Sequence, residues 1–246
     1  MKISIVVITA REDPGFIDLV RSLQENTEFE LELVYVDLAK DSRDGLYEEA
    51  MMQTNIQFKH LKDVGEAVGP APSSARNLGI SQSTGDWIVC IDDLTTVGPD
   101  TLRIHDLAYS MYFDAVVGSY TLNGSASDRR LSDPNAANGP WAASHFYGMH
   151  MGFRKSAWEA VGGFDESFDG VYGWEDCDFG HRLFADGASI AWLPTAKVNC
   201  QKDERHESIQ ARAPMTHNAF VYGELKWRND ALILWNKSLG KIDVRR

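Results

Sequence analysis

The sequence predicts an α/β fold with a mostly parallel central sheet flanked by helices. Short apolar, β-branched runs alternate along the first 92 residues with segments whose apolar residues recur at helical spacing. Such alternation is typical of βαβ units and of a parallel sheet. The composition agrees, because 43% of the 246 residues are hydrophobic and 24% are charged, as in ordinary globular proteins.

The elements follow in order from the amino terminus. Apolar runs predict strands at residues 3–8, 31–36, 56–61 and 87–91. A helix is predicted after the first strand because four apolar residues share one face: Phe16, Leu19, Val20 and Leu23. A second helix, capped by Ser73 or Ser74 and ended by Gly85, is predicted before the last of these strands.

Charge and cysteine usage exclude several classes of protein. The formal net charge of −12 argues against a general nucleic-acid binder, because such a surface repels phosphate. The sequence contains no run of about 18 apolar residues, so it predicts no transmembrane helix. The three cysteines, Cys90, Cys177 and Cys200, fit neither a disulfide framework nor a metal motif, which favours reduced thiols and a cytoplasmic location.

Polar side chains follow three of the predicted strands. Thr9 to Arg11 follow the first strand, Asp37 the second, and Asp92 with Asp93 the last. Ligands of open α/β sheets bind at the carboxyl ends of strands, so we expect these residues to converge on one edge. Adjacent carboxylates repel unless they are solvated or neutralised by a cation. Residues Asp92 and Asp93 therefore fit either Mg²⁺ or Mn²⁺ or a solvated turn.

A second informative stretch lies at residues 162–182. Glu175 and Asp176 are predicted to open a helix, where acidic residues are favoured by the helix dipole. The sharper interpretation makes one of them a general base beside Trp174. Asp178 and Arg182, at i and i+4, are expected to form a surface pair.

These pieces together resemble the GT-A glycosyltransferases of family 2 type, which use nucleotide-diphosphate sugars. The matching stretches, within residues 1–200, are 3–9, 36–37, 75–80, 85–93, 151–155, 162–166, 174–176 and 182–183. The second half, with Gly162 to Glu166 and Trp174 to Asp176, also resembles the carboxyl-terminal part of galactosyl- and N-acetylgalactosaminyltransferases. The resemblance implies a GT-A (nucleotide-diphospho-sugar transferase) fold.

The resemblance also implies roles for the donor-side residues. Thr9, Arg11 and Asp37 would line the nucleoside pocket, with Asp37 accepting a hydrogen bond from the base. Arg76 would lie near the nucleotide. Asp92 and Asp93 would match the Asp-X-Asp region that contacts ribose and metal.

Asp176, with Glu175 beside it, would match the catalytic acidic pair of inverting members. Such a base removes the acceptor hydroxyl proton as oxygen attacks the anomeric carbon. Two departures affect the metal: Leu94 stands where the family usually has a third aspartate, and no histidine lies in residues 198–201. We therefore expect Asp93 and His206 as metal ligands.

The residues that would bind the acceptor substrate are less clearly indicated by the sequence. Residues 124–140 are expected to form a long loop, of the kind that binds ligands or acts as a lid. His145 and His150 are expected in packing or acceptor-pocket roles. Four aromatic residues are candidates for core packing or for sugar stacking: Trp141, Tyr147, Tyr172 and Trp174.

The sequence thus predicts a metal-dependent glycosyltransferase using Mn²⁺ or Mg²⁺, with a UDP-sugar as donor and a glycan or other hydroxyl acceptor. We expect a GT-A domain over residues 1–205 and a helical extension over residues 206–246 packed on it. Two other classes stay open: a non-catalytic sugar-nucleotide or glycan-binding module, and a nucleotidyltransferase.

Overall fold

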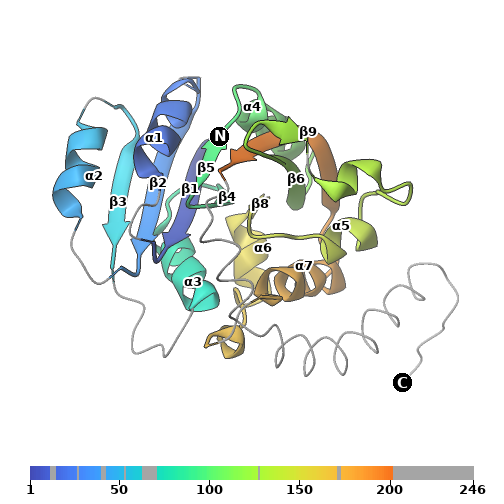
Figure 1. The fold of residues 1–246 in the computed structure, drawn as a ribbon. Helices are drawn as coiled ribbons and strands as arrows, with labels where there is room; N and C mark the ends of the chain where they lie inside the picture. The colour runs from blue at the N-terminus through green and yellow to red at the C-terminus, as the bar shows by residue number, and fades with distance from the viewer. Residues whose placement is uncertain are drawn as a thin grey trace, which may run out of the picture.

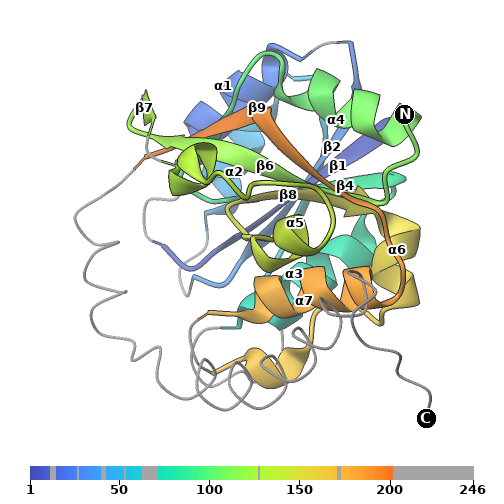
Figure 2. The same cartoon turned by 90° about the vertical axis from the view of Figure 1, so that its right-hand side faces the viewer.

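One mixed β-sheet runs through the protein between two layers of helices (Figures 1 and 2). The computed structural model describes residues 1–11, 15–26, 28–39, 43–52, 54–62, 71–126, 128–170 and 173–201. The strands are β1 (Lys2–Thr9), β2 (Glu30–Asp37), β3 (Gln57–Leu61), β4 (Trp87–Asp92), β5 (Thr95–Val97), β6 (Ala115–Leu122), β7 (Ser125–Ala126), β8 (His150–Arg154) and β9 (Ile190–Cys200). The helices are α1 (Phe16–Gln24), α2 (Asp44–Met51), α3 (Pro72–Gln82), α4 (Thr101–Ser110), α5 (Pro140–Ser144), α6 (Lys155–Ala160) and α7 (Glu175–Ala185), with short 3₁₀ turns η1 (Arg129–Ser132) and η2 (Glu166–Phe168).

The strands are ordered β3-β2-β1-β4-β8-β6-β9-β5, and β7 pairs with β6. The first four are mutually parallel, because each connection between them crosses over through a helix. Beyond β4 the sheet is mixed, since β8 runs antiparallel to β4 and β6 while β6 and β9 are parallel. The predicted α/β fold is confirmed, and its parallel part is the amino-terminal half of the sheet.

The two faces of the sheet are covered by different helices. Alternate β1 residues Ile3, Ile5 and Val7 pack with α1, α2 and α4, whereas Val6 packs on the face of α3, α5 and α7. All four residues predicted for the apolar face of α1 are buried. Figure 2 shows α1 and α4 above the sheet and α3, α5 and α7 below it. Among the described residues, no helix has the length and apolar character needed to cross a membrane.

Helix α3 approaches the sheet closely because Gly79 has no side chain. A Cβ atom on Gly79 would lie 2.7 Å from Val6 Cγ1 and 3.1 Å from Val36 Cγ2. The close approach fixes the position of Arg76, one turn earlier on the same helix.

Three local predictions were wrong, and in the first of them a distant residue supplies the helix cap. Helix α3 is not capped by its own serines: the backbone N–H groups of Ser73 and Ser74 donate to Asp169 at 2.9 and 3.0 Å. Residues Asp178 and Arg182 do pair, at 2.6 Å, but Asp178 is buried rather than on the surface. Finally, residues 124–140 are not an irregular loop throughout, since they contain β7 and η1.

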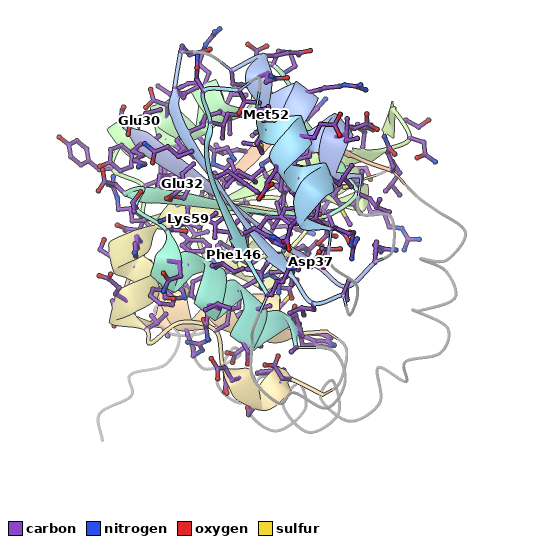
Figure 3. The ribbon with its side chains drawn as sticks, turned by 90° about the vertical axis from the view of Figure 1, so that its left-hand side faces the viewer. Glu30, Glu32, Asp37, Met52, Lys59 and Phe146 are labelled. Carbon is purple, nitrogen blue, oxygen red and sulfur yellow. The ribbon has the colours of Figure 1, made fainter. Side chains whose placement is uncertain are left out.

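Glu32 is a fully buried carboxylate at the end of the sheet away from the functional edge. Figure 3 shows it beside Lys59 of β3, with Asp37 at the opposite end of β2. Its oxygens accept from Ser4 Oγ at 2.5 Å, from Thr84 N at 2.7 Å and from Lys59 Nζ at 2.9 Å. Burial by itself raises the pKa of Glu32, but these donors outweigh burial and lower it to about 2.

The lowered pKa of Glu32 predicts acid-dependent stability. A carboxylate with a depressed folded pKa stabilises the protein above its unfolded pKa, and this stabilisation is lost as pH falls towards the folded value. We expect Glu32→Gln to lower the free energy of unfolding by about 3 kcal/mol at pH 7. The difference from wild type should shrink between pH 4.5 and pH 2. Urea unfolding at several pH values measures it, and a difference that does not change with pH would contradict the assignment.

Candidate active site

The carboxyl ends of β1, β2 and β4 meet at one edge of the sheet, as predicted. Thr9 is in register with Asp37, and Ile8 with Asp92. The register follows from parallel pairing, in which strands that start together also end together. Polar residues from three distant parts of the sequence therefore lie side by side.

Asp93, directly after β4, is held by Thr9, the last residue of β1, and by Arg11, two residues later. Its Oδ2 accepts from Thr9 Oγ1 at 2.7 Å, and its Oδ1 accepts from Arg11 Nε at 3.0 Å. Burial raises the pKa of Asp93, and the Thr9 hydroxyl and the Arg11 charge offset only part of that effect. Thr9, Arg11 and Asp93 thus form one unit in which the carboxylate charge is already balanced.

A cavity of about 660 Å³ opens in front of this edge. Its walls come from the ends of β4, β6 and β9, from η1 and from the segment before β8. The lining residues are Arg11, Asp92, Asp93, Leu94, Thr95, Tyr120, Leu122, Asp128, Arg129, Arg130, Asp133, His145, Tyr147, Met149, Cys200 and Gln201. The lining includes three arginines and four aspartates, so an anionic ligand would need additional positive charge.

The sequence did not predict that Asp128 and Arg130 would form one wall of the cavity. Arg130 donates to Asp128 at 2.8 Å, to the carbonyl of Gly118 at 2.8 Å and to that of His145 at 2.8 Å. Its guanidinium lies 4.8 Å from the ring centre of Tyr147. The pair is buried, and i, i+2 spacing in a polar segment gives no sequence signal for such a contact. Arg129, the neighbouring residue, is exposed on the cavity.

Asp37 lies deeper than the resemblance implied. Its Oδ2 accepts from the Tyr47 hydroxyl at 2.8 Å, and its Oδ1 accepts from Arg43 Nη2 at 3.1 Å and from Ala39 N at 2.9 Å. Only 1% of Asp37 is exposed. Burial, followed by the hydrogen bond to Asp37, raises the pKa of Tyr47. Asp37 therefore holds the segment leading into α2 rather than lining the cavity.

The predicted acidic pair opens helix α7, and its two members have different surroundings. Glu175 is buried and accepts from Arg76 Nη1 at 2.6 Å. Asp176 is partly exposed; its Oδ2 accepts from the Gly148 N–H at 2.7 Å and its Oδ1 from its neighbour Cys177 N at 2.8 Å. The Gly148 peptide lies between Tyr147 and Met149, which both line the cavity. Asp176 is thus attached to the cavity wall, whereas Arg76 is not among the lining residues.

The two histidines of the acceptor side have separate places. His150 is buried, with its Nε2 atom 2.9 Å from His105 Nε2 and its Nδ1 atom 3.0 Å from the Ser119 carbonyl. Burial lowers the pKa of His150 to about 4, so the ring packs as a neutral group. His145 stacks on Trp141 at 4.1 Å between ring centres and lines the cavity.

The residues at the strand end fit a divalent ion only if another ligand shares it. Asp92 lines the cavity, the oxygens of Asp93 are engaged, and Leu94 contributes no oxygen from its side chain. Within the residues that the structure describes, no group of three histidine, cysteine or acidic side chains is placed to hold a metal. The predicted ligand His206, like Tyr172 and the extension over residues 206–246, lies outside those residues. Mg²⁺ and similar ions are often held by one or two carboxylates together with substrate phosphates.

Comparison with protein families gives two matches. The model of glycosyl transferase family 2 matches residues 4–162. A model described as the N-terminal domain of galactosyltransferase matches residues 134–207, the half of the chain in which a galactosyltransferase resemblance was predicted. A search of curated proteins found no match.

Solved structures share the fold at low sequence identity. TarS 1–349 of S. aureus, in complex with UDP-GlcNAc, has a TM-score of 0.66 and 18% identity over 83% of this chain. This chain spans 59% of that structure. The mannosyltransferase PcManGT from Pyrobaculum calidifontis, in complex with GDP-Man and Mn²⁺, has a TM-score of 0.60 and 18% identity over 98% of this chain and 76% of its own. GalNAc-T7 with UDP, GalNAc and Mn²⁺ has a TM-score of 0.65 and 13% identity over 82% of this chain and 43% of its own. The predicted GT-A fold is therefore confirmed.

The buried Asp128–Arg130 pair predicts unequal effects at two neighbouring arginines. Arg130→Met would leave the Asp128 carboxylate buried without its cation, at an expected cost of about 3–5 kcal/mol in unfolding free energy. Arg129→Met, at the exposed neighbour, should change it by less than about 0.5 kcal/mol. Urea denaturation of both variants measures the difference, and equal stabilities would show that the pair does not anchor this wall.

The apolar side chain of Leu94 leads to a prediction for the affinity of the protein for Mn²⁺ in the absence of nucleotide. Leu94→Asp would add a carboxylate beside Asp92, and hard oxygen ligands raise affinity for Mn²⁺. We expect at least about tenfold tighter Mn²⁺ binding without nucleotide, measured by electron paramagnetic resonance of free Mn²⁺. Leu94→Asn, with similar shape and no charge, is the control. Equal affinities of the two variants would mean that position 94 does not face the ion.

Proposed function

The chain belongs to glycosyl transferase family 2, and on this basis we propose that it transfers a sugar from a nucleotide-diphosphate donor to an acceptor hydroxyl with inversion. The observation that carries the proposal is the placement of Asp92 and Asp176 around one cavity. Asp92 lines the cavity at the strand end, and Asp176 is held by the peptide between two lining residues.

Donor binding is assigned to the strand-end edge. Thr9, Arg11 and Asp93 form a rigid, charge-balanced base for the cavity, and Arg129 adds an exposed cation on the other wall. TarS 1–349 is in complex with UDP-GlcNAc and GalNAc-T7 with UDP, which supports a UDP-sugar as the first donor to test. Asp37 would act indirectly, by holding Arg43 and Tyr47.

The anionic cavity supports the use of a divalent ion with the donor. Mn²⁺ or Mg²⁺, held by Asp92 and Asp93 together with the diphosphate, would neutralise the charge of the leaving group. The two neighbours in complex with Mn²⁺ support this part of the proposal.

Asp176 is the proposed general base. The acceptor oxygen forms a bond to the anomeric carbon while the bond from that carbon to the diphosphate oxygen breaks, and the acceptor proton passes to Asp176. The two backbone N–H groups fix the orientation of the carboxylate and leave a lone pair on each oxygen for the proton. The nucleoside diphosphate departs with the electron pair of the broken bond. The acceptor would be a glycan or another hydroxyl compound near His145 and Tyr147.

The base assignment is tested with Asp176→Asn, which keeps the shape but cannot accept a proton. We expect transfer to fall by about 10²- to 10⁴-fold, while calorimetry shows UDP affinity within about twofold of wild type. The control is Asp186→Asn, at the exposed far end of α7. Wild-type turnover by Asp176→Asn would remove Asp176 from the mechanism. Binding of UDP-sugars without transfer by the wild type would instead favour a non-catalytic module.

A further inference from the structure

The two carboxylates at the start of α7 differ in burial, although they are adjacent in the sequence. Gly173 and Trp174, immediately before them, both have positive φ, at 97° and 78°. This conformation is unfavourable for tryptophan, and it is tolerated where the surroundings fix the geometry. The helix that follows carries Glu175 buried, 5% exposed, and Asp176 partly exposed.

Glu175 is committed to Arg76 of α3. Its Oε1 atom lies 2.6 Å from Arg76 Nη1, and both side chains are less than 10% exposed. The Oε2 atom is buried and has no hydrogen-bond partner among the described residues. Burial, and then the charge of Asp176, raises the pKa of Glu175, against the opposing effect of Arg76. Glu175 is therefore too buried to contact an acceptor substrate, and its carboxylate pairs with Arg76 instead.

Arg76 in turn packs directly against the peptide that holds Asp176. A Cβ atom on Gly148 would lie 2.2 Å from Arg76 Nη2 and 3.5 Å from Asp176 Oδ2. Only glycine leaves room for the guanidinium at this position, and the N–H of the same residue donates to Asp176. A single peptide thus separates a permanent positive charge from the proposed base.

An unopposed arginine at this distance would weaken a base, because a nearby cation favours the ionised carboxylate. The buried carboxylate of Glu175 cancels that charge while leaving the guanidinium in place as packing. Among the described residues, Tyr147, before β8, and Cys177, on α7, also interact with Asp176, and Arg130 in η1 acts on both of them.

We propose that Glu175 and Arg76 are a positioning pair for Asp176: Arg76 supports the Gly148 peptide that orients the carboxylate, and Glu175 neutralises the charge of Arg76 behind that peptide. The proposal rests on the proposed function only in naming Asp176 as the base. It divides the acidic pair into one catalytic residue and one positioning residue.

The substitution Glu175→Gln tests the charge without changing the shape. Arg76 stays protonated, so Asp176 should bind its proton less tightly, and the acid limb of the pH profile of kcat/KM should move to lower pH by about one unit. The plateau rate should fall several-fold, because a weaker base transfers the proton less well. Glu175→Asp keeps the charge and should leave the limb within about 0.3 units of wild type. A purely structural role for Glu175 would lower the amount of folded enzyme without moving the limb.

A readout without turnover separates this inference from the proposed function. The carboxyl ¹³C signal of Asp176, assigned by its loss in Asp176→Asn, is followed through a pH titration. Its midpoint should move to lower pH in Glu175→Gln and return in the double variant Arg76→Gln/Glu175→Gln, which removes both charges. An unchanged midpoint in a folded Glu175→Gln protein overturns the proposal, whatever the transfer assay shows.

Folding is checked by thermal melting, because Glu175→Gln leaves Arg76 buried without its anion. If that variant does not fold, the double variant decides, since it carries no unpaired buried charge. A midpoint within about 0.5 units of wild type supports a pair that is neutral toward Asp176, and a larger change in either direction overturns it. Sugar transfer at the wild-type rate by Asp176→Asn would contradict the assignment of Asp176 as the base. The ¹³C titration would still test the proposed effect of the Arg76–Glu175 pair on Asp176.

Discussion

Carboxylates that leave water must find partners, and in this acidic chain that requirement organises the structure. In the part of the chain that the structure describes, six buried carboxylates pair with cations: Glu32 with Lys59, Asp37 with Arg43, Asp93 with Arg11, Asp128 with Arg130, Glu175 with Arg76 and Asp178 with Arg182. Most of these pairs join different elements, so each also fixes how two parts of the chain meet. Because breaking such a pair strands a buried charge at a cost of several kcal/mol, the pairs select one arrangement of the elements around the sheet.

The same requirement shapes the chemistry of the cavity. Carboxylates that pair with arginines, such as Asp93 and Asp128, build its walls. Asp176 is different, because the backbone N–H groups of Gly148 and Cys177 donate to its oxygens. Neutral donors orient a carboxylate without adding a full positive charge, which suits a group proposed to take up a proton. Arg76 and Glu175, which pack behind the Gly148 peptide, neutralise each other and so also add no net charge next to Asp176.

The parallel half of the sheet and the mixed half contribute differently. The parallel half places the strand-end residues by register, and it lies within the region matched by the family 2 model. The mixed half adds β6, β9 and the segment around Arg130, which close the cavity. Leu94 lies on the cavity where the two halves meet.

The sequence by itself determined the first four strands, the apolar face of α1 and the meeting of Thr9, Asp37 and Asp92 at one edge, because these follow from residue periodicity and from parallel register. It also identified the start of α7 at Glu175. Only the tertiary structure decided which charges pair. Arg76 pairs with Glu175, 99 residues away, and Asp37 accepts hydrogen bonds from Arg43 and Tyr47. The nucleotide contacts expected of Arg76 and Asp37 stay predictions. Local periodicity indicates which face of an element is apolar. The partner of a buried charge depends instead on how elements distant in the chain pack together, and a short sequence pattern does not indicate that packing.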